Sequence, residues 1–195
     1  QLETQLQSEY KKRKYALTQT EINSIISLHS NGQQKDVEGV IKVLIQKYSN
    51  ELELYNLSAT FFSEHGKYTA VIQCYQRVLE ITPESAVAHN NLGLAFHNLN
   101  RFDAAIKSYN KAFTLKPSYA EAYYNLGITL STVGQLDAAV KSYQIALMIK
   151  PNFVEAHNNL GNVLSNQGQL DEAIKNFTQA IKIQPDYAEA YNNYG

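Results

Sequence analysis

The sequence predicts an all-α fold, an α-solenoid of antiparallel helix pairs that repeats every 34 residues. Several residue classes share this period along the chain. Glycine recurs at Gly93, Gly127, Gly161 and Gly195, proline at Pro83, Pro117, Pro151 and Pro185, and alanine at Ala105, Ala139 and Ala173. Such a period indicates a repeat architecture, in which each unit buries its apolar face against its neighbours.

Each repeat is predicted to contain two helices joined by a short turn. The first helix spans residues 86–99 in the clearest copy, and a turn at Asn100 ends it; Gly134 and Gly168 take that place in the next copies. The second helix opens with Asp103, which suits the positive end of the helix dipole. Its apolar positions lie three and four apart, as on one face of a helix: Ala105, Ile106, Tyr109, Ala112 and Phe113.

The small residues predict where helices approach closely. Gly93 and Ala105 are expected between the two helices of one repeat, and Ala112 where the second helix meets the next repeat. A bulky side chain at these positions would push apart helices that pack about 8–10 Å from axis to axis.

This pattern resembles the tetratricopeptide repeat (TPR) family. The matching positions are His89, Leu92, Gly93, Phe96, Ala105, Tyr109 and Pro117, then Tyr123, Leu126, Gly127, Leu130, Ala139, Tyr143 and Pro151, then His157, Leu160, Gly161, Leu164, Ala173, Phe177 and Pro185. The resemblance implies a right-handed solenoid whose first helices line a concave groove that grips extended peptides.

The period divides the chain into a tail and an array. Residues 1–17 are predicted to form a charged helix or tail, and residues 18–195 the TPR array. The repeats are 18–51, which is divergent, 52–85, 86–119, 120–153, 154–187 and a partial copy at 188–195. Because the chain starts without methionine and stops inside a first helix with no polar cap, we expect it to be part of a larger protein.

Composition argues against several functions. The net charge is −1, so a general nucleic-acid binder is not expected. No apolar run reaches the length of a membrane span, and no signal peptide opens the chain. Cys74 is the only cysteine, so no disulfide can form within the chain; this favours a reducing, cytoplasmic location.

Asparagine is concentrated on the first helices at positions outside the predicted core. The predicted peptide-binding residues are Asn90, Asn91, Tyr124, Asn125, Asn158, Asn159, Asn162, Asn192, Asn193, Glu121 and Glu155. An asparagine amide offers both a donor and an acceptor, the pair that a peptide group needs. The ladder at Asn91, Asn125, Asn159 and Asn193 resembles that of the repeat domain of O-linked N-acetylglucosamine transferases, which implies a ligand-facing role. A role in tying neighbouring first helices together remains open as well.

The charge of the first helices indicates which charge the ligand is expected to carry. Lysine and arginine are absent from residues 86–100, 120–134 and 154–168, although the chaperone-tail clamp of the family needs them. Glu121, Glu155 and Glu189 occur there instead, which favours a neutral or mildly basic ligand.

No enzyme, cofactor or metal site is predicted. His89 and His157 occupy aromatic core positions two repeats apart, too far from each other to share a zinc ion. The basic run Lys11 to Lys14 is interpreted as a solvated helix face, with a nuclear-targeting or anion-binding patch as the alternative.

The predicted function is a protein–protein interaction scaffold that binds a peptide or partner segment in its groove. Two alternatives remain open at this point. The chain could be the substrate-recruiting arm of a larger enzyme such as a glycosyltransferase. It could also be a self-assembling scaffold that forms homo-oligomers through its uncapped C-terminal end.

Overall fold

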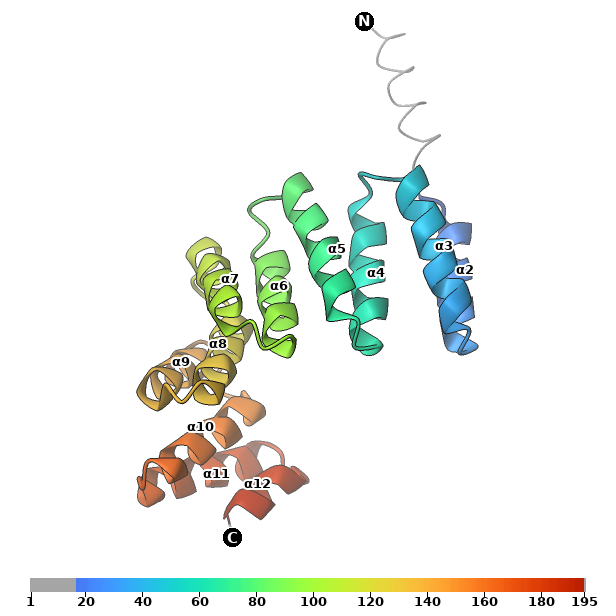
Figure 1. Ribbon diagram of the computed structural model, residues 1–195. Helices are drawn as coiled ribbons and strands as arrows, with labels where there is room; N and C mark the ends of the chain where they lie inside the picture. The colour runs from blue at the N-terminus through green and yellow to red at the C-terminus, as the bar shows by residue number, and fades with distance from the viewer. Residues whose placement is uncertain (1–16, 195) are drawn as a thin grey trace, which may run out of the picture. The chain divides into compact units, whose positions relative to one another are not determined.

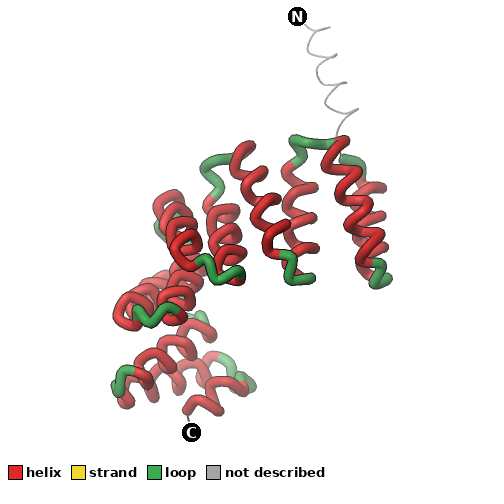
Figure 2. The backbone as a smooth tube through the Cα atoms, viewed as in Figure 1, coloured by secondary structure: helices red, strands yellow, loops and turns green. Residues whose placement is uncertain are grey.

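The computed structural model describes residues 17–194, and the secondary structure of this part consists of helices joined by turns and loops, with no strand (Figures 1 and 2). The predicted all-α fold is thereby confirmed. The helices are α2 (Gln19–Ser30), α3 (Gln34–Lys47), α4 (Leu52–Glu64), α5 (Tyr68–Ile81), α6 (Ala86–Asn98), α7 (Phe102–Leu115), α8 (Ala120–Thr132), α9 (Leu136–Ile149), α10 (Val154–Asn166), α11 (Leu170–Ile183) and α12 (Ala188–Tyr194). The predicted tail over residues 1–17, with its basic run, lies outside the described residues except for Leu17.

The chain divides into two compact units, residues 1–83 and residues 84–195. The described part of the first unit pairs α2 with α3 and α4 with α5. The second unit pairs α6 with α7, α8 with α9 and α10 with α11, and α12 packs against α11. In the second unit α6 also contacts α8, α8 contacts α10, and α10 contacts α12. The first helices of successive repeats are therefore neighbours in that unit.

Local chemistry sets the helix boundaries. Thr18 and Glu21 form a capping box at the start of α2, with the Thr18 side chain accepting from the Glu21 N–H. The turns inside the helix pairs need a residue in the left-handed region, and Gly32, Gly66, Gly134 and Gly168 supply it. In the pair α6–α7 the residue is Asn100, with φ of 57°, which asparagine tolerates better than most side chains.

The predicted close approach of paired helices is confirmed. A Cβ atom on Gly127 would lie 2.6 Å from Cε1 of Tyr143, and one on Gly93 would lie equally close to Tyr109. The small second-helix residue that was predicted to meet the next repeat is Ala180 in the last full copy. It is fully buried and shares a cluster with Val154 of α10 and Ala190 of α12.

The first unit keeps this packing with different side chains. Val71 replaces the second-helix alanine and is buried. The neighbouring isoleucines of α2 differ in burial, because Ile25 is buried whereas Ile26 is 48% exposed. Ile26 lies at the edge of a small cavity of about 80 Å³ that is also lined by Ile25, Leu57 and Phe61. The apolar residues of α2 are therefore only partly covered: Ile25 packs in the core, and Ile26 is accessible to solvent.

Candidate functional site

The asparagines of the second unit lie on adjacent first helices and hydrogen-bond across them. Asn125 Nδ2 of α8 donates to Asn90 Oδ1 of α6 at 3.0 Å. One repeat later, Asn159 Nδ2 of α10 donates to Tyr124 Oη of α8 at 3.1 Å. Asn193 Nδ2 of α12 donates to Asn158 Oδ1 of α10 at 2.9 Å. In the last three copies, the asparagine before Leu-Gly or Tyr-Gly thus bonds to the side chain 35 residues earlier. We call Asn91, Tyr124, Asn125, Asn159, Asn162 and Asn193 the first-helix face.

Burial separates the predicted binding residues into three groups. Asn90 and Asn158 are only 5% and 1% exposed, so in this structure they serve as acceptors between helices. Asn91, Tyr124, Asn125, Asn159 and Asn162 are half-buried. Asn192, Asn193, Glu121 and Glu155 are exposed. The helix-tying role is thus observed directly, while the ligand-facing role stays a prediction that concerns the half-buried and exposed side chains.

Asn125 keeps hydrogen-bonding capacity after it bonds to Asn90. One amide proton is used by Asn90 Oδ1. Its own Oδ1 accepts no hydrogen bond from any described residue, and a second amide proton remains. The half-buried Asn125 amide can therefore donate one hydrogen bond to, and accept one from, the peptide group of a bound segment.

Tyr124 shows that acidic groups gather at this face. Burial is the largest cause that raises the pKa of its hydroxyl, and the nearby carboxylates of Glu155 and Glu189 raise it further. Both effects disfavour a phenolate anion. The same carboxylates attract positive charge, so the local potential suits a cationic group.

Sequence reasoning missed residues in the loops before the first helices. The Lys150 ammonium lies 3.5 Å from Glu121 Oε1 and 4.3 Å from the centre of the Phe153 ring. The Phe153 ring in turn lies 4.7 Å from the Tyr124 ring. Tyr187 donates its hydroxyl to Glu189 Oε2 at 2.8 Å. The 34-residue spacing of Phe153 and Tyr187, and of Tyr119 before them, was the available signal.

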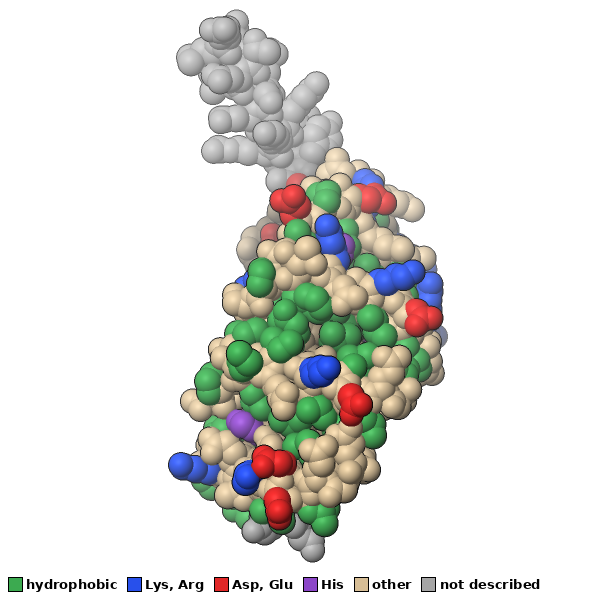
Figure 3. All heavy atoms as spheres, turned by 90° about the vertical axis from the view of Figure 1, so that its left-hand side faces the viewer, with side chains coloured by type: hydrophobic (Ala, Val, Ile, Leu, Met, Phe, Trp, Pro, Cys, Tyr) green, Lys and Arg blue, Asp and Glu red, His purple; other side chains and the backbone are tan. Residues whose placement is uncertain are grey.

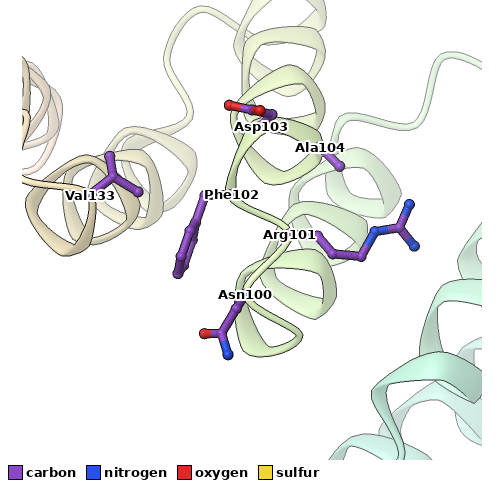
Figure 4. Close-up of a pocket in the computed structure, with 6 residues that line it drawn as sticks. All are labelled: Asn100, Arg101, Phe102, Asp103, Ala104 and Val133. Carbon is purple, nitrogen blue, oxygen red and sulfur yellow. The ribbon is translucent and has the colours of Figure 1, made fainter.

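A separate depression lies at the turn between α6 and α7 (Figure 4). Its volume is about 390 Å³, and Asn100, Arg101, Phe102, Asp103, Ala104 and Val133 line it. The Phe102 ring points toward the side of Val133, while the Arg101 side chain points away from it. The Arg101 guanidinium instead lies 4.7 Å from the centre of the Phe96 ring. The charged groups here do not converge on one point, and none belongs to the first-helix face.

The described residues hold no group of three or more His, Cys, Asp or Glu side chains that could bind a metal ion. Within the same part of the chain, no helix has both the length and the apolar character needed to cross a membrane. On the face drawn in Figure 3, lysine and arginine side chains lie scattered among acidic, neutral and hydrophobic ones, without a continuous basic patch among the residues that are described.

Solved structures share this fold. A crystal structure of MamA is 26% identical with a TM-score of 0.73, and the match covers 84% of this chain and 95% of that one. MamA 41-end from Desulfovibrio magneticus RS-1 is 18% identical with a TM-score of 0.75, covering 88% and 99%. YrrB, whose structure is described as "a TPR protein with an unusual peptide-binding site", is 19% identical with a TM-score of 0.68, covering 95% of each chain. No curated protein matches the chain significantly.

Family models match the repeats themselves. A model of the tetratricopeptide repeat matches residues 154–187, and a TPR repeat model matches residues 62–100, 95–132 and 133–168. These matches cover more than half of the chain and include each repeat with a Leu-Gly pair and a second-helix alanine. The chain therefore belongs to the tetratricopeptide repeat family.

Proposed function

We propose that this chain is a protein-interaction scaffold that binds an extended polypeptide segment along the first-helix face of its second unit. The observation that carries the proposal is the state of Asn125, a half-buried amide that ties two helices together and still has one donor and one acceptor available. Asn91 and Asn159 stand in the same register 34 residues before and after it.

A ladder of this kind suits backbone recognition. The Asn125 amide can exchange a donor and an acceptor with a peptide group, so binding at this position depends little on the side chains of the ligand. The hydrogen bonds between neighbouring helices hold the amides in place before a ligand arrives, which lowers the entropy lost on binding. The peptide-binding site named for YrrB, a protein of the same fold, supports the proposal at the level of the fold.

A photo-crosslinking experiment tests the proposal. A benzophenone amino acid at Thr132, which is exposed near the end of α8, should capture a partner from native lysate. The same amino acid at Lys107, exposed on the second helix α7, should not capture it. Mass spectrometry of the crosslink should identify one linear segment of the partner, and a synthetic copy of that segment should bind the purified chain.

The asparagine variants supply the matched control. Asn125→Ala combined with Asn159→Ala should weaken binding of the synthetic segment by about tenfold or more, because two peptide-group contacts are lost. Asn110→Ala combined with Asn152→Ala, both at exposed positions outside the first helices, should leave it unchanged. Equal binding by both double variants, with helicity intact, would exclude the asparagine ladder as the binding site.

A further inference from the structure

Three of the four first helices of the second unit carry a glutamate, and none of the four carries a lysine or an arginine. Neither lysine nor arginine occurs in α6, α8, α10 or the described α12. Glu121, Glu155 and Glu189 stand one per repeat, each at the second residue of its helix, and all are exposed. In the first of these repeats Val87 takes the corresponding place and is 54% exposed. The acidic period therefore covers α8, α10 and α12.

The three glutamates differ in whether a positively charged side chain of the same chain pairs with them. Lys150 lies 3.5 Å from Glu121, and both side chains are about half exposed. One repeat later, Gln184 occupies the position that corresponds to Lys150. Glu155 consequently forms no ion pair with any described residue. Glu189 accepts a hydrogen bond from the neutral Tyr187 hydroxyl, which leaves its charge in place.

The separation of the packed helices that carry these carboxylates limits the conformations in which a ligand can place a cation opposite each helix. Packed helices lie about 8–10 Å apart, and the hydrogen bonds between α8, α10 and α12 hold these helices in direct contact. A polyproline II segment rises about 3.1 Å per residue with three residues per turn, so every third side chain returns to one side after about 9 Å. A β-strand alternates its faces every second residue, and residues three apart point to opposite sides.

We infer that the segment bound on this face adopts a polyproline II conformation and carries a lysine or arginine at every third residue, opposite Glu121, Glu155 and Glu189. The inference rests on the proposed function, and it adds the charge, spacing and backbone conformation of the partner. Polyproline II also leaves the ligand's peptide groups without internal hydrogen bonds. The peptide groups of the ligand are then available to Asn125 and Asn159, which lie on the same helices as Glu121 and Glu155, four residues further along.

Synthetic peptides of one composition test the spacing. The probes contain three lysines in a frame of proline, serine and alanine, with the lysines at every third residue, at every second residue, or in one block. Fluorescence anisotropy at low and at physiological salt measures their affinity for the whole chain. The peptide with lysine at every third residue should bind about tenfold more tightly than either rearranged peptide, and added salt should weaken it.

Charge variants locate the contact. Glu121→Gln, Glu155→Gln and Glu189→Gln combined should weaken the every-third peptide by about tenfold. The matched control combines Asp103→Asn, Asp137→Asn and Asp171→Asn, which are exposed, share the 34-residue register and also lie in the first turn of their helices. This control changes the net charge equally and should leave the affinity within about twofold.

Lys150 and Gln184 occupy equivalent positions in the loops before α10 and α12, and exchanging their residue types gives two variants with opposite expected effects. Gln184→Lys should place an ammonium beside Glu155 as Lys150 lies beside Glu121, and so weaken the every-third peptide severalfold. Lys150→Gln should free Glu121 and strengthen binding. Both positions are exposed, and because Lys150→Gln also removes the ammonium from the Phe153 ring, urea unfolding of this variant should accompany the binding measurement.

The outcomes separate this inference from the proposed function. If all three peptides bind equally and the glutamate variants weaken them equally, the spacing and conformation are wrong, although the face is acidic. If none of the peptides binds while the crosslinked natural segment does, and needs Asn125 and Asn159, the charge inference is wrong and the scaffold function stands. If neither binds at the asparagines, both proposals fail.

Discussion

Asn125 of α8 donates its side-chain amide to Asn90 Oδ1 of α6 at 3.0 Å, 35 residues away in the sequence. The acceptor residue is only 5% exposed, so water cannot easily replace the donor. An unpaired buried acceptor costs more free energy than a well-made hydrogen bond contributes. This contact between repeats therefore contributes to the stability of the second unit even before any ligand binds.

A double-mutant cycle on Asn90 and Asn125 should measure that contribution. Asn125→Ala leaves Asn90 Oδ1 buried without this partner, and we expect it to lower the free energy of unfolding by about 1–3 kcal/mol. The coupling energy between Asn90→Ala and Asn125→Ala should be about 0.5–1.5 kcal/mol. Urea unfolding followed by circular dichroism gives all four values. Strict additivity of the two single changes would show that the contact is energetically silent.

Gly127→Ala should be destabilising although alanine is the better helix former. A Cβ atom at this position would lie 2.6 Å from Cε1 of the buried Tyr143 ring, so either the ring or the helix must move. We expect a net loss of about 1–3 kcal/mol in the free energy of unfolding. Gly39→Ala in α3 is the matched control, because its Cβ would meet nothing within 4 Å. That variant should gain about 0.5–1 kcal/mol from helix propensity.

Glu21 should make stability depend on pH in the acid range. The backbone N–H of Thr18 is the main group that lowers the pKa of its carboxyl from 4.5 to about 2, and Lys47 and Tyr48 assist. A carboxyl whose pKa is lowered in the folded state stabilises the fold above its unfolded pKa, and this contribution is lost as the pH falls through the folded value. The gap in unfolding free energy between the unmodified chain and Glu21→Gln should therefore be constant above pH 4.5 and shrink from there toward pH 2. A gap that stays constant over this range would show that the carboxyl is not held in its charged form by these contacts.

Cys74 should react slowly with alkylating reagents while the chain is folded. Burial raises the pKa of its thiol to about 11, and the residue is 4% exposed. Only the thiolate reacts, so both effects slow the reaction. Iodoacetamide at pH near 8 should modify it within minutes in denaturant but only over hours in buffer, as followed by mass spectrometry. Ser118→Cys, in an exposed turn, should be modified rapidly in both and serves as the control.

The repeat period was enough to predict the helix pairs and their closest contacts. Glycine, alanine and an aromatic residue in one register require two helices to approach at Gly93 and Tyr109, and the structure places them in contact. Turns at Gly134 and Gly168 followed from the same register, because only a few residues accept a left-handed backbone.

The partners of the asparagines could not be predicted in the same way. The period fixes where Asn159 lies on its helix, but not that its amide reaches Tyr124 rather than a ligand. That choice depends on the rotation between successive repeats and on the side chain at the facing position, which is tyrosine in α8 and asparagine in α6. Likewise, the contact of Lys150 with Glu121 depends on the path of a loop, for which the helical period carries no signal.

The aromatic position of the second helix differs between copies, and this difference predicts a stabilising substitution. Tyr109 is fully buried, and its hydroxyl is the one buried side-chain polar atom in the described part of the chain without a partner in hydrogen-bonding geometry, although the nearby Thr129 side chain opposes the rise that burial causes in its pKa. The same position is Phe177 two repeats later, where it is 2% exposed, so the site accepts a ring without a hydroxyl. Burying an unpaired hydroxyl costs about 1–3 kcal/mol relative to leaving it in water.

Tyr109→Phe should therefore raise the free energy of unfolding by about 1 kcal/mol, since it removes the unpaired group and keeps the ring against Gly93. Tyr143→Phe is the control. The Tyr143 hydroxyl is not among the unpaired buried atoms of the described residues, and the nearby Asn159 side chain opposes the rise in its pKa, so removing this hydroxyl should be neutral or destabilising. Thermal and urea unfolding of the two variants decide the matter. A destabilised Tyr109→Phe would mean that the hydroxyl has a partner in solution, either the Thr129 side chain or a bound water, and that the substitution removes this hydrogen bond.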